Sequence, residues 1–157
     1  MKTLVAFFSA SGETKKLAQT LASVADGTLY QIRPETEYTP ADLDWRDKHS
    51  RSTIEMQDPT CRPALAGMVE GISQYDTIFI GFPIWWYEAP RVIQTFLESY
   101  DLTGKTVIPF ATSGGSDMGN TDSILQRSAP KAGWKLGKRL KATASTQEVT
   151  DWLESLK

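Results

Sequence analysis

Three short segments of this sequence carry side chains suited to binding a small molecule. The first, S-A-S-G-E-T at residues 9–14, combines hydroxyl groups with one glycine and leads into an amphipathic stretch. At a helix N-terminus, free N–H groups and the helix dipole favour an anion such as phosphate. Gly12 lets the backbone approach such a ligand closely. The same residues also fit an ordinary helix start capped by Ser11, so this segment alone leaves both interpretations open.

The second segment, P-I-W-W-Y at residues 83–87, contains two adjacent tryptophans. Successive side chains of a strand face opposite sides, so at least one indole is expected near the surface. Stacking on a flat ring would add about 0.5–1.5 kcal/mol beyond the area buried. Alternatively, both indoles pack beneath the polar segment 33–63. The third segment, T-S-G-G-S at residues 112–116, suits close approach of the backbone to a ring edge, although Gly-Gly is also common in turns.

The elements that position these segments alternate between strand and helix. Continuous apolar runs predict strands at 3–8, 28–32, 77–82 and 106–111, and a weaker fifth strand within 135–142. Helical periodicity predicts helices at 17–25, from Pro90, at 122–128 and at 146–156, with shorter helical pieces at 68–74 and within 40–56. The alternation predicts an α/β fold with a single domain over residues 1–157. Its expected core is a doubly wound five-stranded parallel sheet of order 2-1-3-4-5, with helices on both faces.

The predicted fold brings the three segments to one place. Ligands of such sheets bind at the carboxyl ends of the strands, near the point where the strand order switches. The segments directly follow the first, third and fourth predicted strands. Together their side chains describe a ligand with an anionic end and a flat aromatic end.

The composition limits the classes of partner that the protein is expected to bind and the cellular compartment in which it is expected to work. The chain has 157 residues and a net charge of -2, which gives no indication of nucleic acid as a partner. Its longest strongly apolar stretch, 78–86, is far below the roughly 20 residues that span a bilayer, so no membrane insertion is expected. Cys61 is the only cysteine, which excludes an internal disulfide and favours a reducing compartment, the cytoplasm.

The sequence does not match other phosphate-binding motifs or a metal site. A Walker loop needs a lysine after its second glycine, and Gly12 is followed by Glu13; the dinucleotide fingerprint is also absent. A phospho-receiver domain would need acids after the first and third strands, where Ser9 and Pro83 stand. No His/Cys cluster indicates a metal, and the lone His49 is expected to be solvated.

The three segments resemble the flavin-binding loops of the flavodoxin family, in particular its short-chain members with a P-I-W-W loop. Residues 9–14 resemble the family's phosphate loop, [ST]-x-[ST]-G-x-T, residues 81–90 its second flavin loop, and residues 112–116 its third. The similarity spans nearly the whole chain and implies non-covalently bound FMN. It implies phosphate contacts from Ser9, Ala10, Ser11, Gly12, Glu13 and Thr14. It also implies ring and ribityl contacts from Pro83, Ile84, Trp85, Trp86 and Tyr87, and contacts to the ring's polar edge from Thr112, Ser113, Gly114 and Gly115.

Two residues depart from the family pattern. Glu13 replaces the asparagine usual in the phosphate loop, and we expect its N–H to bind while its carboxylate turns to solvent. Electron-carrying members often place glycine beside the flavin, where a peptide flip accepts a hydrogen bond from the half-reduced ring. Trp86 is instead followed by Tyr87, and non-glycine residues disfavour positive φ. The resemblance therefore implies weaker stabilisation of half-reduced flavin than in a dedicated one-electron carrier.

Three functions remain open at this stage. The chain is either an electron carrier between protein partners, or an NAD(P)H-dependent FMN reductase of quinones or nitro compounds, or a non-redox module that has lost the cofactor. The intact loops argue against the third. A net charge of -2 is mild for a carrier that docks through an acidic face. Segment 33–63 forms either a substrate wall over the flavin or a plain surface helix. The chemistry itself requires no acid–base pair, because a flavin supplies it.

Overall fold

The central strands of the sheet are continuous apolar runs of the sequence. A computed structural model describes residues 2–113 and 118–157 of the chain. The four main strands are β1 (Thr3–Phe7), β2 (Thr28–Gln31), β3 (Thr77–Pro83) and β4 (Thr106–Thr112). All pairs are parallel, and the order β2-β1-β3-β4-β5 confirms the predicted doubly wound topology.

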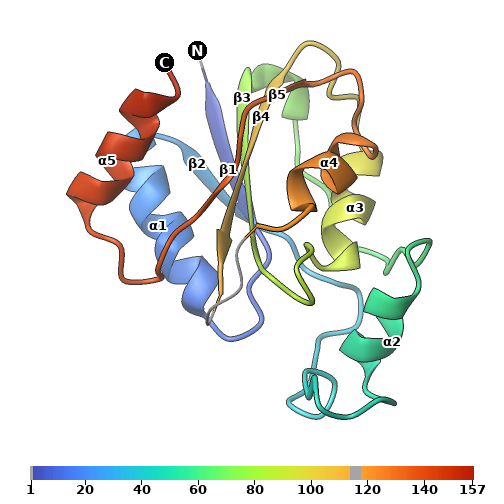
Figure 1. Cartoon of the computed structure of the whole chain (residues 1–157). Coiled ribbons are helices and arrows are strands. Elements are labelled where there is room, and N and C mark those ends of the chain that lie inside the picture. The colour runs from blue at the N-terminus through green and yellow to red at the C-terminus, as the bar shows by residue number, and fades with distance from the viewer. Residues whose placement is uncertain (1, 114–117) are drawn as a thin grey trace.

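Helices cover both faces of the sheet. The α-helices are α1 (Glu13–Ala25), α2 (Arg51–Gln57), α3 (Arg91–Glu98), α4 (Thr121–Gln126) and α5 (Thr146–Ser155). Helices α1 and α5 lie on one face, and α3 and α4 on the other (Figure 1). Each face has its own apolar cluster, because strands buried on both sides present alternate residues to each layer. No helix among the described residues combines the length and apolarity needed to cross a bilayer.

The fifth strand position differs from the predicted strand at 135–142. It is filled by two short strands, β5 (Gly133–Trp134) and β6 (Lys138–Arg139), which both pair with β4. The carbonyls of Val107 and Ala111 accept hydrogen bonds at this edge of β4. Pro109 lies midway between them and faces the same edge, but it has no N–H to donate. The ladder is therefore interrupted opposite Pro109.

Segment 33–63 projects beyond the carboxyl ends of the strands and contains less helix than expected (Figure 1). The predicted helix within 40–56 is wrong for its first half, because helix begins only at Arg51. Before it, Asp42, Asp44 and Asp47 accept hydrogen bonds from nearby backbone N–H groups, which favours turns over helix. The helical piece predicted at 68–74 is likewise reduced to a 3-10 turn, η1 (Ile72–Gln74).

Candidate functional site

A pair of buried hydroxyls brings the three predicted loops together. Thr14, in the first turn of α1, and Thr112, at the end of β4, have their Oγ1 atoms 2.7 Å apart. The Thr112 carbonyl accepts a hydrogen bond of 2.9 Å from the N–H of Ile84, the first residue after β3. The first loop therefore ends, and the second and third loops begin, within one hydrogen bond of Thr112. Both threonines are almost fully buried, so their hydroxyls connect the loops on the protein side of the site.

The first loop holds its shape through Ser9. The Ser9 Oγ accepts hydrogen bonds from the N–H of Gly12 at 3.0 Å and of Lys15 at 3.2 Å. Its oxygen is therefore used inside the loop, while its hydroxyl hydrogen can still be donated to a ligand. Helix α1 begins at Glu13 with Gly12 as N-cap and no side-chain cap. The alternative of a helix start capped by Ser11 is thus wrong.

The surface of this loop suits an anion. Ser11, Gly12 and Glu13 are exposed, whereas Ala10 is half-buried against the core. Gly12 has φ 90, and a Cβ built on it would meet no atom within 4 Å, so open space lies above the loop. The first N–H groups of α1 have no intrahelical partner and point toward the N-terminal end. The exposed side chain of Glu13 agrees with the expectation that its carboxylate turns to solvent.

The second loop is a two-residue turn with an unusual backbone. Trp85 and Glu88 exchange two backbone hydrogen bonds, of 2.9 and 3.0 Å, across the turn. Between them, Trp86 and Tyr87 have φ 49 and φ 64, the positive values of a type I′ turn. We expected a non-glycine residue to avoid positive φ here, and that expectation is wrong. The inference of weaker stabilisation of half-reduced flavin thereby loses its premise.

The two tryptophans have different environments. Trp85 is half-buried and packs edge-on against Phe8, at a ring-centroid distance of 5.8 Å, and against Tyr38, at 5.4 Å. Trp86 is 42% exposed, and Tyr87 is 61% exposed. One indole thus packs against segment 33–63, and the other is exposed at the tip of the turn. Pro83 and Ile84 are half-buried at the start of the turn.

The third loop approaches the second at its far end. Thr112 is buried and Ser113 half-buried, whereas the predicted contacts Gly114 and Gly115 lie outside the described residues. Beyond them, Thr121 Oγ1 donates a hydrogen bond of 3.2 Å to the Tyr87 carbonyl. Gly119 lies so close that a Cβ on it would be 2.8 Å from the same carbonyl oxygen. These contacts hold the strained turn from the side of α4.

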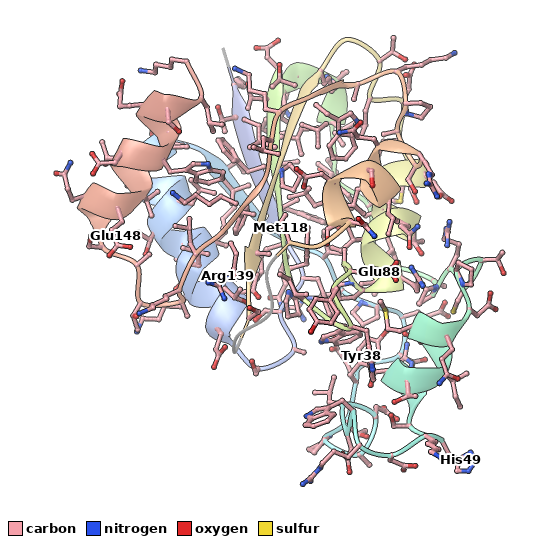
Figure 2. All side chains as sticks on the ribbon, in the orientation of Figure 1. Tyr38, His49, Glu88, Met118, Arg139 and Glu148 are labelled. Carbon is pink, nitrogen blue, oxygen red and sulfur yellow. The ribbon has the colours of Figure 1, made fainter. Side chains whose placement is uncertain are left out.

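Segment 33–63 packs on the site through a buried polar cluster. The Tyr38 hydroxyl donates to the Glu55 carboxylate, and Arg51 Nε pairs with Glu55 at 2.9 Å. The Arg51 guanidinium lies 3.8 Å above the Tyr38 ring, a cation–π geometry. Burial, and then the hydrogen bond to Glu55, raise the pKa of Tyr38 well above its usual range, so this phenol stays neutral. Figure 2 shows Tyr38 close to the sheet, and exposed His49 at the far tip of the segment.

Arg91 ties α2 to the aromatic turn. It is 2% exposed, and its Nη1 pairs with Glu88 Oε1 at 2.9 Å. It also donates to the carbonyls of Glu55 at 3.3 Å and Met56 at 2.8 Å, which lie in the last turn of α2. Helix α2 is therefore a packed part of the site rather than a plain surface helix. Sequence reasoning missed Arg91, Glu55 and Ser52, because residues distant in the chain supply their surroundings.

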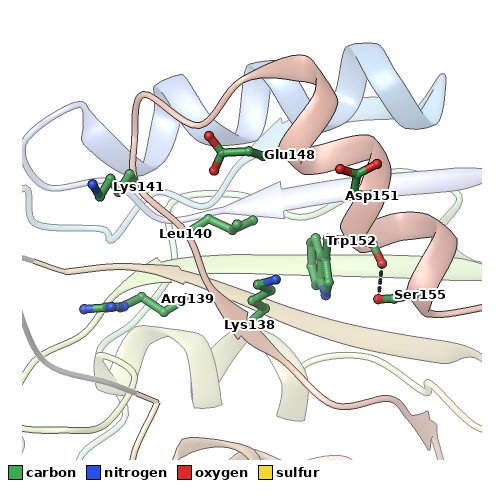
Figure 3. A pocket seen from close by; sticks show the side chains of 8 residues that line it. All are labelled: Lys138, Arg139, Leu140, Lys141, Glu148, Asp151, Trp152 and Ser155. Atoms are coloured by element: carbon green, nitrogen blue, oxygen red, sulfur yellow. Dashed lines mark hydrogen bonds between the residues drawn. The ribbon is translucent and has the colours of Figure 1, made fainter.

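Three cavities of similar size lie among the described residues, on different parts of the molecule. One, of about 480 Å³, lies between β6 and α5 (Figure 3) and is lined by no described residue of the three loops. A second, of about 450 Å³, lies beside α4. A third, of about 400 Å³, lies between segment 33–63 and the aromatic turn. It is lined by Leu43, Trp45, Ser52, Ile84, Trp85, Trp86 and Tyr87. Within residues 2–113 and 118–157, no group of three or more His, Cys, Asp or Glu is placed to hold a metal.

Known proteins place this chain in a family. A structure from Bacteroides uniformis ATCC 8492, designated a flavoprotein, is 52% identical, with a TM-score of 0.93 over 98% of this chain and 97% of that one. A similarly designated structure from Bacteroides eggerthii DSM 20697 is 48% identical, with a TM-score of 0.94 over 99% and 97%.

A more distant flavoprotein, from Lactobacillus acidophilus NCFM, was solved in complex with FMN. It is 26% identical, with a TM-score of 0.71 over 97% of this chain and 98% of that one. None of the curated proteins matches this chain. The family model described as Flavodoxin matches residues 2–156, and the chain therefore belongs to the flavodoxin family.

Proposed function

We propose that this protein binds FMN non-covalently and transfers electrons through it. The observation that carries the proposal is the convergence of the three loops on the Thr14–Thr112 hydroxyl pair. An exposed, glycine-capped helix start and two exposed aromatic residues lie around that point, which matches the anionic and flat ends of the nucleotide. The FMN complex of the Lactobacillus acidophilus flavoprotein supports the same ligand.

The residues present fit the cofactor. The open space above Gly12 leaves room for a phosphate among the exposed N–H groups of the loop and the Ser9 hydroxyl. Thr14 is buried and bonded to Thr112, so we assign it to the support of the loop as much as to ligand contact. Trp86 and Tyr87 would flank the ring, with Ile84 and Trp85 behind them. Bound FMN supplies the redox chemistry, and the protein binds and orients it and excludes water.

The electron partner is either another protein or a small acceptor. The single free cysteine, Cys61, is consistent with a protein that acts in the reducing cytoplasm, where thiols do not form disulfides. A second candidate function, an FMN-dependent reductase using NAD(P)H, is favoured by the aromatic pocket between segment 33–63 and the turn. A protein-to-protein carrier has no need of such a pocket, whereas a reductase of quinone-like compounds does.

A titration of the purified apoprotein with FMN tests the first part of the proposal. We expect quenching of the flavin fluorescence with 1:1 stoichiometry, and a yellow protein after gel filtration. Riboflavin, which lacks the phosphate, should bind at least tenfold more weakly, because it forgoes charge-assisted hydrogen bonds worth about 1.5–3 kcal/mol each. Unquenched FMN fluorescence would refute cofactor binding, and equal affinity for riboflavin would refute the phosphate site.

Anaerobic mixing of the holoprotein with NADH or NADPH separates the two functions. Rapid bleaching of the flavin absorbance by either nucleotide identifies a reductase. No bleaching until a separate reductase protein is added identifies a carrier.

A further inference from the structure

The aromatic pocket of about 400 Å³ lies apart from the phosphate loop. Its lining comes from segment 33–63 on one side and from the turn at residues 84–87 on the other. None of the described residues of the first and third loops lines it. The pocket therefore lies on the side of the aromatic turn that faces segment 33–63.

The walls of this pocket suit a flat, mainly apolar molecule. Trp45, Trp86 and Tyr87 are 70%, 42% and 61% exposed, and they are three of the seven exposed large hydrophobic residues among those described. Exposed aromatic residues that lie together mark a binding site more often than exposed residues that are scattered over the surface. The volume falls within the roughly 300–1,000 Å³ of small-molecule sites. Aromatic rings favour a planar partner, because stacking adds to area burial.

Ser52 adds one polar group to these walls. It is 2% exposed, and its Oγ has no hydrogen-bond partner among the described residues. The neighbouring hydroxyls of Ser50 and Thr53 pair with each other at 2.8 Å, whereas the Ser52 hydroxyl has no such partner among the described residues. A buried hydroxyl without a partner costs about 1–3 kcal/mol and requires an explanation. Because this hydroxyl makes no hydrogen bond within the described protein, its donation to a ligand in the pocket would break none.

The pocket is also held in shape before any ligand arrives. The Ser52 N–H donates to the Asp42 carbonyl at 3.0 Å, which fixes the start of α2. Arg91 binds the other end of α2 to Glu88 of the turn. Both walls are therefore anchored to the same framework, and binding needs little ordering of the chain.

We propose that this pocket binds the small electron acceptor, a planar aromatic compound with a carbonyl oxygen. The ring stacks on Trp45 and Trp86, and the carbonyl oxygen accepts a hydrogen bond from the Ser52 hydroxyl. The inference rests on the proposed function, because it places an acceptor beside the aromatic turn that would also flank the flavin.

An NMR titration of the FMN-loaded protein with 1,4-naphthoquinone tests the site, followed through the indole N–H signals of Trp45 and Trp86. We expect saturable shifts in the wild type and about fivefold weaker binding in Ser52→Ala, the loss of one neutral hydrogen bond. Naphthalene, which has the same shape without the oxygens, should bind both proteins equally. Trp45→Ala should weaken both probes roughly tenfold, and Leu136→Ala, an equally exposed apolar truncation elsewhere, should weaken neither.

Stability and FMN affinity distinguish a ligand site from a structural role. Removal of an unpaired buried hydroxyl should leave the melting temperature of Ser52→Ala unchanged or slightly raised. FMN affinity should be unchanged in both Ser52→Ala and Trp45→Ala. Equal naphthoquinone binding by the wild type and Ser52→Ala would overturn the proposal, as would a loss of FMN affinity in either variant, because the pocket would then hold the flavin. If the wild type binds no FMN, the proposed function fails, and the same titration of the apoprotein still decides the pocket.

Discussion

Gly12 offers the sharpest test of the phosphate loop, because a second glycine provides a matched control. Gly12 has φ 90 and Gly104 has φ 78, and a Cβ at either position would meet no atom within 4 Å. Alanine at each position therefore suffers the backbone cost of a left-handed conformation without a steric clash. That cost is roughly 1–2 kcal/mol. We expect Gly12→Ala and Gly104→Ala to lower the free energy of unfolding of the apoprotein by similar amounts.

The two variants should differ only when FMN is added. The methyl group of Gly12→Ala projects into the open space where the phosphate is proposed to lie, and it should disrupt at least one charge-assisted hydrogen bond. Such a bond contributes about 1.5–3 kcal/mol, so FMN should bind at least tenfold more weakly. Gly104 lies between α3 and β4, away from the loops, and its variant should bind FMN like the wild type.

Urea denaturation of the apoproteins and flavin fluorescence titrations measure both quantities. Excess FMN should also stabilise Gly104→Ala more than Gly12→Ala, since ligand stabilisation follows the ratio of concentration to dissociation constant. Equal FMN affinity in the two variants would refute the placement of the phosphate above Gly12. Unequal apoprotein stabilities would refute the argument that only backbone conformation matters at these positions.

Three further predictions concern the buried polar contacts. The pKa of Tyr38 is raised above its ordinary 10.0 by burial and Glu55, so its stabilising effect is complete below pH 10 and is lost at higher pH. Between pH 10 and 11, the free energy of unfolding measured in urea should therefore fall less steeply with pH in Tyr38→Phe than in the wild type. The same pH dependence in both proteins would contradict this. Thr14→Val and Thr112→Val should each cost about 1–3 kcal/mol, and the double variant clearly less than their sum, whereas additive costs would mean that the hydroxyls do not interact. Arg91→Met should cost about 3 kcal/mol and speed amide hydrogen exchange in α2 more than in α5, and equal acceleration would disprove the tie between Arg91 and α2.

Most of the sheet could be predicted from the sequence because its central strands, β1, β3 and β4, are buried on both faces. A continuous apolar run such as 77–82 has one plausible role in a chain of alternating strands and helices. The fifth strand could not be located in the same way, since its boundaries depend on its neighbour. Pro109 in β4 interrupts the ladder, and the effect appears in residues 135–137, far along the chain.

Segment 33–63 was harder to predict because long-range contacts fix it. Its sequence is polar, so no apolar periodicity marks a packed face. It is held by the contact between Tyr38 and Glu55 within the segment, and by hydrogen bonds from Arg91, which lies 35 residues beyond Met56 in the chain. The sequence left open whether the segment forms a substrate wall over the flavin or a plain surface helix. It did not indicate that α2 would pack against the aromatic turn.

The residues of the candidate site were predictable in kind but not in conformation. Hydroxyls, glycine and adjacent tryptophans at strand ends pointed to a nucleotide with a flat ring. The structure was needed to show which of these residues hydrogen-bond to one another within the protein. Ser9 accepts hydrogen bonds inside the first loop, and Thr14 bonds Thr112 at the start of the third. Ser11 does not cap the helix.

The backbone of Trp86 and Tyr87 shows why local rules fail at this site. The positive φ of two large residues destabilises the folded state by roughly 1–3 kcal/mol each. Type I′ turns usually have glycine or asparagine at these positions. The conformation persists because the two backbone bonds between Trp85 and Glu88, and the Thr121 hydrogen bond to Tyr87, over-determine it. Glycines would relieve the strain but would remove the aromatic surface from the tip of the turn. The structure therefore retains a costly backbone where the proposed ligand would contact aromatic rings, which is the pattern expected of a functional site and not of a simple connection.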